Sequence, residues 1–358
     1  MTLINCKYFN GYKPCKFLKK GAVKKCNKNC KRKSTPSERI LIIKKGAMGE
    51  VLRCTPLLRK IREEFKNPEI WWITDYPELL NEEWVDRILK FDWQGYCVVK
   101  NTIFDIVYSL DKELISCSLA KEVKARIKKG FKAENGKILP YDKDAEYLWL
   151  RGIDDDFMRK DKRHYIEEIF EACGFKFSNE RYILPKYEVP SVDVGNSKTV
   201  VGLNTGVSDV WLTRLWNEKN WIELARMLIE NDFEVALLGG KAEHERNKRI
   251  AKESKAKYFG VFPARKFIGL VSLMDIVVTQ VTFALHVAVG LEKKVVLLNN
   301  IFNKNEYYFY GLPHVILEPD VPCKACYKQK FDEKCCVRNC MDLIKPRDVF
   351  NAILKLAK

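Results

Sequence analysis

Short apolar runs and amphipathic stretches alternate along most of this chain. Continuous apolar runs at residues 40–43 and 70–73 are typical of parallel strands that are covered on both faces. Between them, residues 50–65 carry apolar side chains at helical spacing, so this part predicts a βαβ unit. Further runs at 85–89 and 104–108 and a helical stretch at 161–173 continue the pattern. A parallel sheet flanked by helices accounts for this half of the chain.

The same alternation begins again after residue 198. Apolar runs predict strands at 199–203, 234–238, 273–278 and 294–298, and helical spacing predicts helices at 220–231 and 284–289. Residues 184–198 show little periodicity and are predicted to link two domains. At 358 residues, the chain also exceeds what one hydrophobic core usually serves.

We therefore expect an α/β protein with two doubly wound domains that face a cleft. The predicted domains are residues 38–190 and 195–322. A cysteine-rich basic extension at 1–37 precedes them, and a cysteine finger with a C-terminal helix at 323–358 follows. Open α/β sheets bind ligands at the carboxyl ends of their strands, so we expect the functional site in the cleft.

The net charge of +17 comes mostly from one terminal segment. Residues 1–33 hold eleven Lys and Arg and no acidic residue, which leaves 53 basic against 47 acidic residues elsewhere. Nucleic-acid binding by the whole chain is therefore disfavoured. The segment is suited to an anionic membrane surface, an anionic acceptor or RNA, or it is a solvated basic surface around a metal site.

Hydropathy predicts a cytoplasmic protein, able to contact the inner face of the membrane peripherally. Apolar runs fall short of the roughly 20 residues that a membrane-spanning helix needs, and residues 1–33 are too polar for a signal peptide. Thirteen cysteines in such a compartment favour metal ligation or buried thiols over disulfides. Four of them lie inside apolar segments and are predicted to be small buried residues: Cys54, Cys97, Cys117 and Cys173.

The other cysteines form two clusters with spacings that suit tetrahedral zinc or iron. The N-terminal cluster is Cys6, Cys15, Cys26 and Cys30. The C-terminal cluster is Cys323, Cys326, Cys336 and Cys340, with Cys335 as an alternative to Cys336. A structural metal would cross-link the short N-terminal segment, which has little core of its own. Unrelated free thiols are the alternative interpretation.

A small-residue loop follows the first predicted strand. Gly46, Ala47, Met48 and Gly49 let the backbone approach a ligand closely and aim the next helix at it. The loop is neither a Walker loop nor a full G-x-G-x-x-G fingerprint, so dinucleotide oxidoreduction is disfavoured. Glu50 in the first helical turn is either a general base or a carboxylate favoured by the helix dipole.

Small residues also follow two strands of the second predicted domain. Thr205 and Gly206 come after one strand, and Gly239 and Gly240 come after the next. Each glycine alone could be a turn residue, but their joint position predicts a nucleotide site. Arg214 lies between the two loops, and an arginine can bridge a diphosphate.

These segments resemble glycosyltransferase family nine, the ADP-heptose glycosyltransferases with the GT-B fold. The resemblance covers about residues 38–345 and is most specific in residues 46–51 and 55–58, which match the family's G-A-x-G-D-V and T-x-P-L-L motifs. It implies that Glu50, in the place of the family's aspartate, takes the proton from the acceptor hydroxyl. Residues 46–49 then form the acceptor-side loop.

The resemblance also implies a set of donor-binding residues. It assigns donor phosphate to Arg214, through the family's K-x-W motif, and a nucleotide-side loop to Gly239, Gly240 and Glu243. The last family motif aligns with Thr282, Leu285 and His286, and Glu306 also fits. The implied donor-side residues are Thr205, Gly206, Arg214, Gly239, Gly240, Glu243, Thr282, Leu285, His286 and Glu306. For His286, a hydrogen-bonded core histidine is the alternative interpretation.

The donor side departs from the family pattern in two places. Val281 stands where the family has an aspartate that contacts the donor sugar, and residues 299–302 replace the usual F-G-P-T. Similar C-terminal cysteine fingers occur in iron-containing members of the family, so the resemblance implies a structural metal. We expect an inverting transferase that uses an ADP-sugar, with no catalytic metal, and a glycan, lipopolysaccharide-core, lipid or protein acceptor. The alternative is a catalytically weakened homologue that binds nucleotide sugar or glycan.

Overall fold

The computed structural model describes residues 5–27, 29–195 and 199–358. It contains two compact units. The first comprises residues 1–46, 54–149 and 169–180, and the second comprises 47–53, 150–168 and 181–358. The chain thus passes from one unit to the other five times. Each unit is described by itself.

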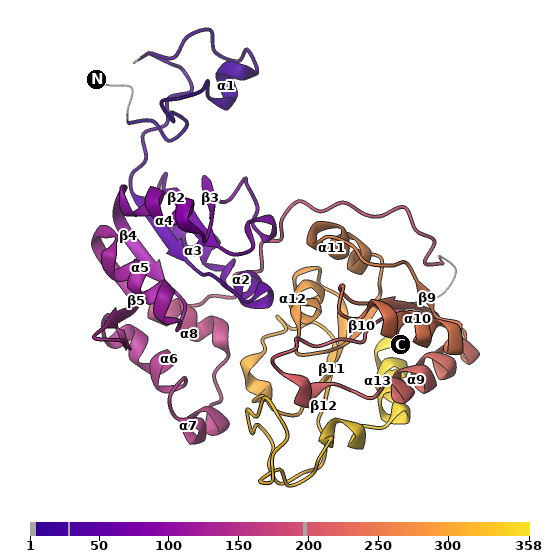
Figure 1. Ribbon diagram of the computed structural model, residues 1–358. Helices are drawn as coiled ribbons and strands as arrows, with labels where there is room; N and C mark the ends of the chain where they lie inside the picture. The colour runs from indigo at the N-terminus through magenta and orange to yellow at the C-terminus, as the bar shows by residue number, and fades with distance from the viewer. Residues whose placement is uncertain (1–4, 28, 196–198) are drawn as a thin grey trace. The chain divides into compact units, whose positions relative to one another are not determined.

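The first unit is built on a six-stranded sheet with the order β3-β2-β1-β4-β5-β6 (Figure 1). All neighbours are parallel except β5 and β6, which form an antiparallel hairpin. The strands are β1 Arg39–Ile43, β2 Glu69–Thr74, β3 Arg87–Lys90, β4 Ile103–Ser109, β5 Lys124–Glu134 and β6 Lys137–Pro140. The apolar runs predicted β1, β2 and β4 well. Only two of the eleven residues of the lysine-rich β5 are buried, so it has no apolar run to reveal it.

The predicted helix over residues 50–65 is wrong as a single element. It is two helices, α2 Met48–Cys54 and α3 Leu57–Glu64. Pro56 caps α3 and has no N–H to continue the ladder of α2, so the chain breaks there. The stretch 161–173 likewise becomes helical only at Tyr165, in α8 Tyr165–Ala172. The other helices of this half are α1 Lys16–Lys19, α4 Trp93–Lys100, α5 Leu114–Glu122, α6 Glu146–Leu150 and α7 Asp155–Lys160.

The second unit holds a fully parallel six-stranded sheet with the order β12-β11-β10-β7-β8-β9. Its strands are β7 Val200–Asn204, β8 Glu234–Leu238, β9 Lys257–Tyr258, β10 Ile276–Gln280, β11 Lys294–Leu298 and β12 His314–Leu317. The predicted run at 273–278 began too early, because α11 Ala264–Ser272 is capped by Leu273. The expected class, an α/β protein with two doubly wound parallel sheets, is confirmed. Residues 196–198 of the predicted link lie outside the described residues.

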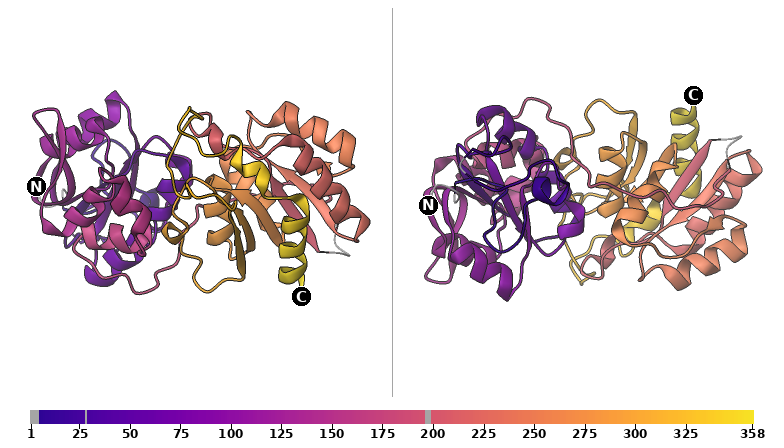
Figure 2. Two further views of the ribbon diagram at one scale, coloured as in Figure 1. Left: turned by 90° about the horizontal axis from the view of Figure 1, so that it is seen from below. Right: turned by 90° about the horizontal axis from the view of Figure 1, so that it is seen from above.

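Helices cover both faces of the second sheet. They are α9 Glu218–Glu230, α10 His244–Ser254, α11, α12 Phe283–Gly290 and α13 Pro346–Ala357. Figure 2 shows α13, at the C-terminal end of the colour scale, beside the strands of this sheet, and it packs against α9, β10, β11 and β12. Among the described residues, no helix is long and apolar enough to span a membrane.

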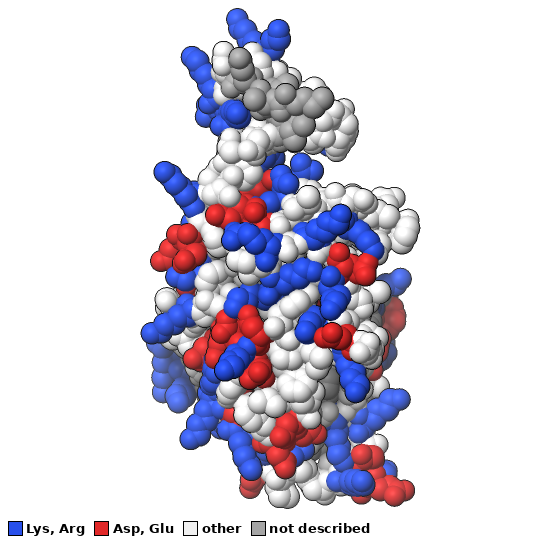
Figure 3. Space-filling model, turned by 90° about the vertical axis from the view of Figure 1, so that its left-hand side faces the viewer, with Lys and Arg blue, Asp and Glu red and all other residues white. Residues whose placement is uncertain are grey.

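The N-terminal extension is basic, as its composition predicts. Residues 5–37 contain neither Asp nor Glu. The segment at the top of Figure 3 accordingly carries Lys and Arg on the face drawn, whereas carboxylates are interspersed with basic side chains below it. Of the cysteines predicted to be buried, Cys54, Cys117 and Cys173 are buried, but Cys97 is only partly buried on the short helix α4.

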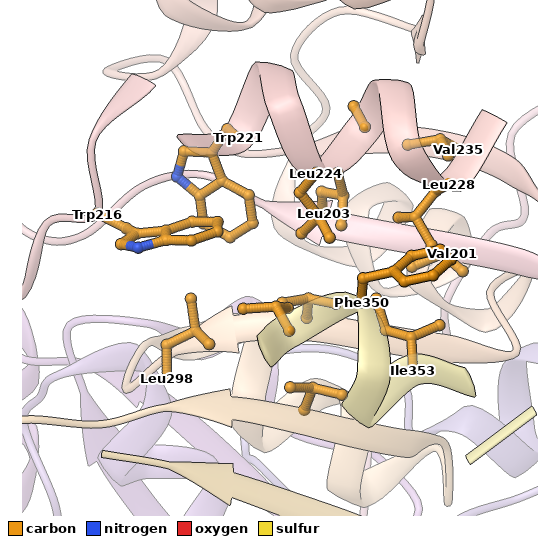
Figure 4. Close-up of a cluster of buried hydrophobic side chains, with 14 of the residues drawn as sticks. Val201, Leu203, Trp216, Trp221, Leu224, Leu228, Val235, Leu298, Phe350 and Ile353 are labelled. Carbon is orange, nitrogen blue, oxygen red and sulfur yellow. The ribbon is translucent and has the colours of Figure 1, made fainter. Parts of the chain in front are cut away.

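The core of the second unit joins α9 and α13 to one face of the sheet (Figure 4). Trp216 and Trp221 meet edge to face with ring centroids 4.7 Å apart, and Trp216 Nε1 donates to the carbonyl of Ile344 at 2.9 Å. Phe350 and Ile353 carry α13 into this cluster. The C-terminal helix is therefore part of the core that holds the parallel sheet.

Removing the Ile353 side chain should destabilise this unit strongly. Ile353 is fully buried, so Ile353→Ala leaves a cavity and should lower the free energy of unfolding by about 2–5 kcal/mol. The matched control is Leu354→Ala on the same helix, because Leu354 is 37% exposed and should cost roughly 1 kcal/mol or less. Urea denaturation of both variants checks this, and equal losses would contradict the assignment of α13 to the core.

Candidate functional site

An ion pair between Glu50 and Arg53 lies on the short helix α2. Arg53 Nη1 is 2.9 Å from Glu50 Oε1. The Glu50 side chain is 31% exposed, whereas that of Arg53 is 5% exposed. Burial alone would lower the pKa of Arg53, but Glu50 and Glu306 outweigh it and hold that pKa above its ordinary value. A permanently charged, buried arginine therefore holds a carboxylate that solvent can reach.

Two tyrosine rings surround the Arg53 guanidinium. Its Cζ atom lies 3.9 Å from the ring centroid of Tyr165, at the start of α8, and 5.8 Å from that of Tyr307. Such packing fixes the plane of the guanidinium. In the described part of the chain, Arg53 Nη2 and the Tyr307 hydroxyl are buried and have no hydrogen-bond partner. These two atoms could donate to an oxygen-rich ligand.

His286 packs directly against the glycine loop. A Cβ atom on Gly49 would lie 2.5 Å from His286 Cδ2, so only glycine fits at this position. His286 Nδ1 is 3.2 Å from the Tyr182 hydroxyl. Burial, followed by the nearby Arg53 charge, lowers the pKa of His286 to about 3. His286 is therefore a neutral, hydrogen-bonded histidine at the base of the site, which fits the core interpretation of this residue.

Glu306 belongs to a buried network around Arg151. Arg151 pairs with Glu306 at 2.8 Å, with Glu168 at 2.6 Å and with Asp161 at 3.6 Å. The Tyr327 hydroxyl also donates to Glu306 Oε1 at 2.9 Å. Burial raises the pKa of Glu168 to about 7, which relieves the excess of negative charge around one arginine. The carboxylate of Glu306, predicted to bind the donor, is thus already engaged by two protein donors.

The structure brings together the small residues after β7 and β8. Glu243 lies over Gly206, where a Cβ atom would be 2.1 Å from the Glu243 Cδ. A Cβ on Gly239 would be 2.8 Å from Glu243 Cβ, and the Gly240 N–H donates to Glu243 Oε2 at 2.8 Å. Thr205 is buried, and its hydroxyl donates to Asn247 Oδ1 on α10 at 2.5 Å. These contacts hold the two strand-end loops against the start of α10.

Arg214 reaches the loop that follows β10. Its Nη1 donates to the carbonyl of Val281, and its Nη2 donates to the Ser208 hydroxyl at 3.0 Å. Burial lowers the pKa of Arg214 to about 10, which still leaves it charged at neutral pH. Its Nε is buried without a hydrogen-bond partner among the described residues. The residue predicted to hold donor phosphate therefore keeps one free donor atom.

Thr282 and Leu285 occupy the start of α12. The Thr282 hydroxyl is 3.2 Å from Asn204 Nδ2 and 3.1 Å from Thr279 Oγ1, which ties this loop to β7 and β10. Leu285 is a buried core residue. Gln280, at the end of β10, is fully buried and neither atom of its amide has a hydrogen-bond partner within the described ranges. An unsatisfied buried amide is unusual in a folded protein, so this strand end has polar atoms that a water or a ligand could satisfy.

The acceptor-side loop is divided between the two units. Gly46 is the last residue of the first segment of the first unit. A Cβ atom on Gly46 would lie 3.3 Å from the Tyr76 ring. Ala47 is exposed, and Met48 begins α2 in the second unit. Gly49 and Glu50 therefore lie in the same unit as His286, Glu306 and Arg214, and not with the rest of the first predicted domain.

The C-terminal cysteines depart from the predicted arrangement. Cys323 and Cys336 form a disulfide, so the expectation against disulfides is wrong here. Sulfurs bonded to each other cannot both act as thiolate ligands, so the predicted set that includes both is corrected. Cys323, Cys326, Cys335 and Cys340 line one cavity of about 30 Å³, which makes Cys335 the better-placed alternative.

The N-terminal cysteines are all free and also gather around one cavity. Cys6, Cys15, Cys26 and Cys30 line a space of about 20 Å³. Burial and then the three neighbouring thiols raise the pKa of Cys26. Over residues 5–27, 29–195 and 199–358, no three His, Cys, Asp or Glu side chains are placed so that they could hold a metal ion.

Several residues of this site escaped the sequence-based prediction. Arg53 could have been found, because a Glu–Arg pair spaced three residues apart on a helix is a recognisable signal. Tyr165, Tyr182 and Arg151 carried no such signal. They come from separate segments, and only the folded chain places them around Arg53, His286 and Glu306.

Comparisons with known proteins agree with this fold. The sequence model of glycosyltransferase family 9 (heptosyltransferase) matches residues 162–336. No curated protein matches the chain. The structure of a family 9 glycosyl transferase from Veillonella parvula is similar, with 15% identity, a TM-score of 0.68, and coverage of 90% of this chain and 97% of that one. The heptosyltransferase WaaC of E. coli, solved with ADP, shows 15% identity and a TM-score of 0.62 over 89% of this chain and 100% of that one.

A third similar structure contains iron. The dodecameric iron-containing glycosyltransferase TibC from enterotoxigenic E. coli shows 14% identity and a TM-score of 0.57, over 90% of this chain and 80% of that one. Identities this low establish a shared fold and do not by themselves establish a shared substrate. The expected GT-B class is confirmed by these structures.

The depressed pKa of His286 predicts a loss of stability in acid. A histidine that is neutral when folded contributes stability that is complete above its unfolded pKa of 6.5 and is lost as the pH falls toward 3. Between pH 7 and pH 5 the loss from this residue should approach 2 kcal/mol. His286→Gln keeps an acceptor for the Tyr182 hydroxyl but cannot gain a proton, so its urea midpoint should fall less over this range. The exposed His314 provides the control His314→Gln, which should behave like the unmodified chain; equal acid sensitivity of all three proteins would refute the prediction.

Proposed function

We propose that this chain is a glycosyltransferase of family 9, the heptosyltransferase family, whose sequence model matches residues 162–336, and that it transfers a sugar from an ADP-sugar to an acceptor hydroxyl with inversion. The observation that carries the proposal is the Glu50–Arg53 pair. Glu50 is accessible at the first turn of α2, next to the glycine loop, and a buried arginine pairs with its carboxylate and orients it. A general base needs both properties.

The proposed reaction is a single displacement at the sugar. Glu50 accepts the proton of the acceptor hydroxyl, whose oxygen forms a bond to the anomeric carbon. The bond from that carbon to the diphosphate oxygen breaks on the opposite face, and ADP leaves with the electron pair. Attack from the opposite face inverts the anomeric configuration.

The leaving diphosphate gains negative charge during this step. Arg214 is charged, has a free Nε and lies at the loop after β10, so we assign it to this charge. The loops that end in Gly206 and Gly240, closed by Glu243, supply a surface without side chains for the nucleotide. An arginine and backbone donors can neutralise a diphosphate, so the proposal uses no catalytic metal.

Heptose is the sugar that we propose, because the family model and the solved relatives are described as heptosyltransferases. A TibC structure contains ADP-D-beta-D-heptose, and the matching WaaC structure contains ADP. The acceptor belongs to the class of glycans, a lipopolysaccharide core, lipids or proteins. We place the reaction in the cytoplasm, with peripheral contact at the inner face of the membrane through the basic extension.

A structural zinc or iron at the C-terminal cysteines remains a separate proposal. As the residues are bonded in this structure they do not fit such an ion, because Cys323 and Cys336 are joined to each other. Reduction of that bond would free Cys323 to join Cys326, Cys335 and Cys340 around their shared cavity. No step of the reaction depends on this ion.

Val281 favours one alternative, a weakened homologue that binds nucleotide sugar without transferring it. Its side chain cannot contact a sugar hydroxyl as the family's aspartate would, and its carbonyl is taken by Arg214. A panel of ADP-sugars distinguishes the two functions. The enzyme releases ADP in the presence of an acceptor, whereas a binding protein gives heat in calorimetry and no ADP.

Replacing Glu50 with glutamine should abolish transfer. Glu50→Gln keeps the size of the side chain and removes its basicity, so kcat should fall roughly 10²–10⁴-fold while the affinity for ADP stays unchanged. ADP release measures the first and calorimetry with ADP measures the second. The control is Glu63→Gln on the neighbouring helix α3, whose side chain is 68% exposed. If Glu50→Gln retained most of its activity, Glu50 would not be the base.

Arg53 should act as a positioning residue for Glu50. In Arg53→Lys the charge is kept and the planar contact with Tyr165 is lost, so we expect a drop in kcat of about tenfold with little change in KM for the donor. Arg53→Met removes the charge as well, which should lower kcat further and move the acidic limb of the pH profile upward, because a carboxylate without its cation binds protons more readily. An unchanged pH profile in Arg53→Met would limit Arg53 to a structural role.

A further inference from the structure

The N-terminal extension has no hydrophobic core of its own. From residue 5 to residue 38, no described residue is fully buried. Its helix α1 is four residues long and contributes no buried side chain. A segment this short and polar does not gain enough from burial to offset the entropy of ordering it. Yet its backbone returns on itself, with the N–H of Lys7 donating to the carbonyl of Ser34 at 2.9 Å, and a cross-link would supply the stability that burial does not.

Four cysteine sulfurs are the candidates for that cross-link. The cavity of about 20 Å³ is lined by Cys6, Cys15, Cys26 and Cys30, with the rings of Tyr8 and Phe17 beside them. All four cysteines are free of disulfides. They come from four separate points of the chain and line the same cavity.

A tight turn follows two of these cysteines, and a backbone donor faces the sulfur of one of them. The N–H of Phe9 donates to the carbonyl of Cys6 at 2.9 Å, and the N–H of Lys33 donates to the carbonyl of Cys30 at 2.9 Å, so a tight turn follows each cysteine. The N–H of Ser34 also points at Cys6 Sγ at 3.5 Å. Backbone donors aimed at sulfur stabilise thiolate charge and orient metal ligands.

We propose that Cys6, Cys15, Cys26 and Cys30 bind one tetrahedral divalent metal ion of the zinc class, and that this ion holds the extension together. Four thiolates and one divalent ion carry a net charge of −2, which the surrounding lysines and arginines neutralise. Each thiol that ligates loses its proton to solvent as its sulfur–metal bond forms. The thiols are gathered but not yet in ligating positions, so the ion would draw them inward, which loops without a core allow.

This site is independent of the proposed transferase reaction and can be tested without any substrate. The full chain is purified under reducing conditions, and its zinc content is measured by mass spectrometry before and after equilibration with Zn²⁺. We expect one equivalent that is absent from the double variant Cys26→Ser, Cys30→Ser. Cys97→Ser, which changes a partly buried thiol outside both clusters, is the matched control and should retain it. A second double variant, Cys326→Ser with Cys335→Ser, removes thiols of the C-terminal cluster only. It should therefore retain the zinc equivalent of the N-terminal cluster.

A second measurement does not depend on how the variants fold. Maleimide labelling followed by peptide mapping should show that Zn²⁺ slows the labelling of all four N-terminal thiols in the unmodified chain by tenfold or more. Titration with Co²⁺ should give a sulfur-to-cobalt charge-transfer band that the double variant lacks. Equal zinc content in the unmodified chain and the double variant, or labelling rates that Zn²⁺ does not change, would overturn the proposal.

Discussion

The ion pair between Arg53 and Glu50 is the interaction on which the rest of the site depends. A guanidinium that is almost fully buried must be neutralised, and Glu50, on the same helix, lies within 2.9 Å of it. Removing the Glu50 carboxylate would take away the closest negative charge from a buried guanidinium, and an uncompensated buried charge is costly. Burial lowers the pKa of His286 most, and the charge of Arg53 lowers it further, so that ring stays neutral. The Arg53 charge thus acts on both Glu50 and His286.

The second constraint is the close approach of a side chain to the backbone of a loop. It acts on the loop that contains Gly49 and on the loop that contains Gly206. Gly49 lies against His286, and Gly206 lies against Glu243, at distances where any Cβ would collide. These glycines are required by packing as well as by ligand access. The packing explains how short loops at the ends of parallel strands keep a fixed shape without a ligand, since each loop rests on a side chain from another element.

Much of the fold followed from the sequence, and the exceptions have physical causes. Residues 234–238 and 294–298 became β8 and β11 as predicted, because a strand buried on both faces needs an uninterrupted apolar run. The helix predicted over 50–65 failed at Pro56, whose effect on the backbone outweighs apolar spacing. The hairpin of β5 and β6 was missed because β5 is rich in lysine and has only two buried residues.

By itself, the sequence determined the fold class and the positions of most parallel strands, and it predicted Glu50, Arg214 and the loop glycines as site residues. These depend on local chemistry: apolar runs, turn residues and motifs in continuous segments. Only the tertiary structure decided that Arg53 supports Glu50, that the Glu306 carboxylate is shared with Arg151 and Tyr327, and that Cys323 bonds to Cys336. Except for Arg53 and Glu50, these partners are at least 13 residues apart in the chain, so their pairing is set by how the sheets and helices pack and not by local sequence.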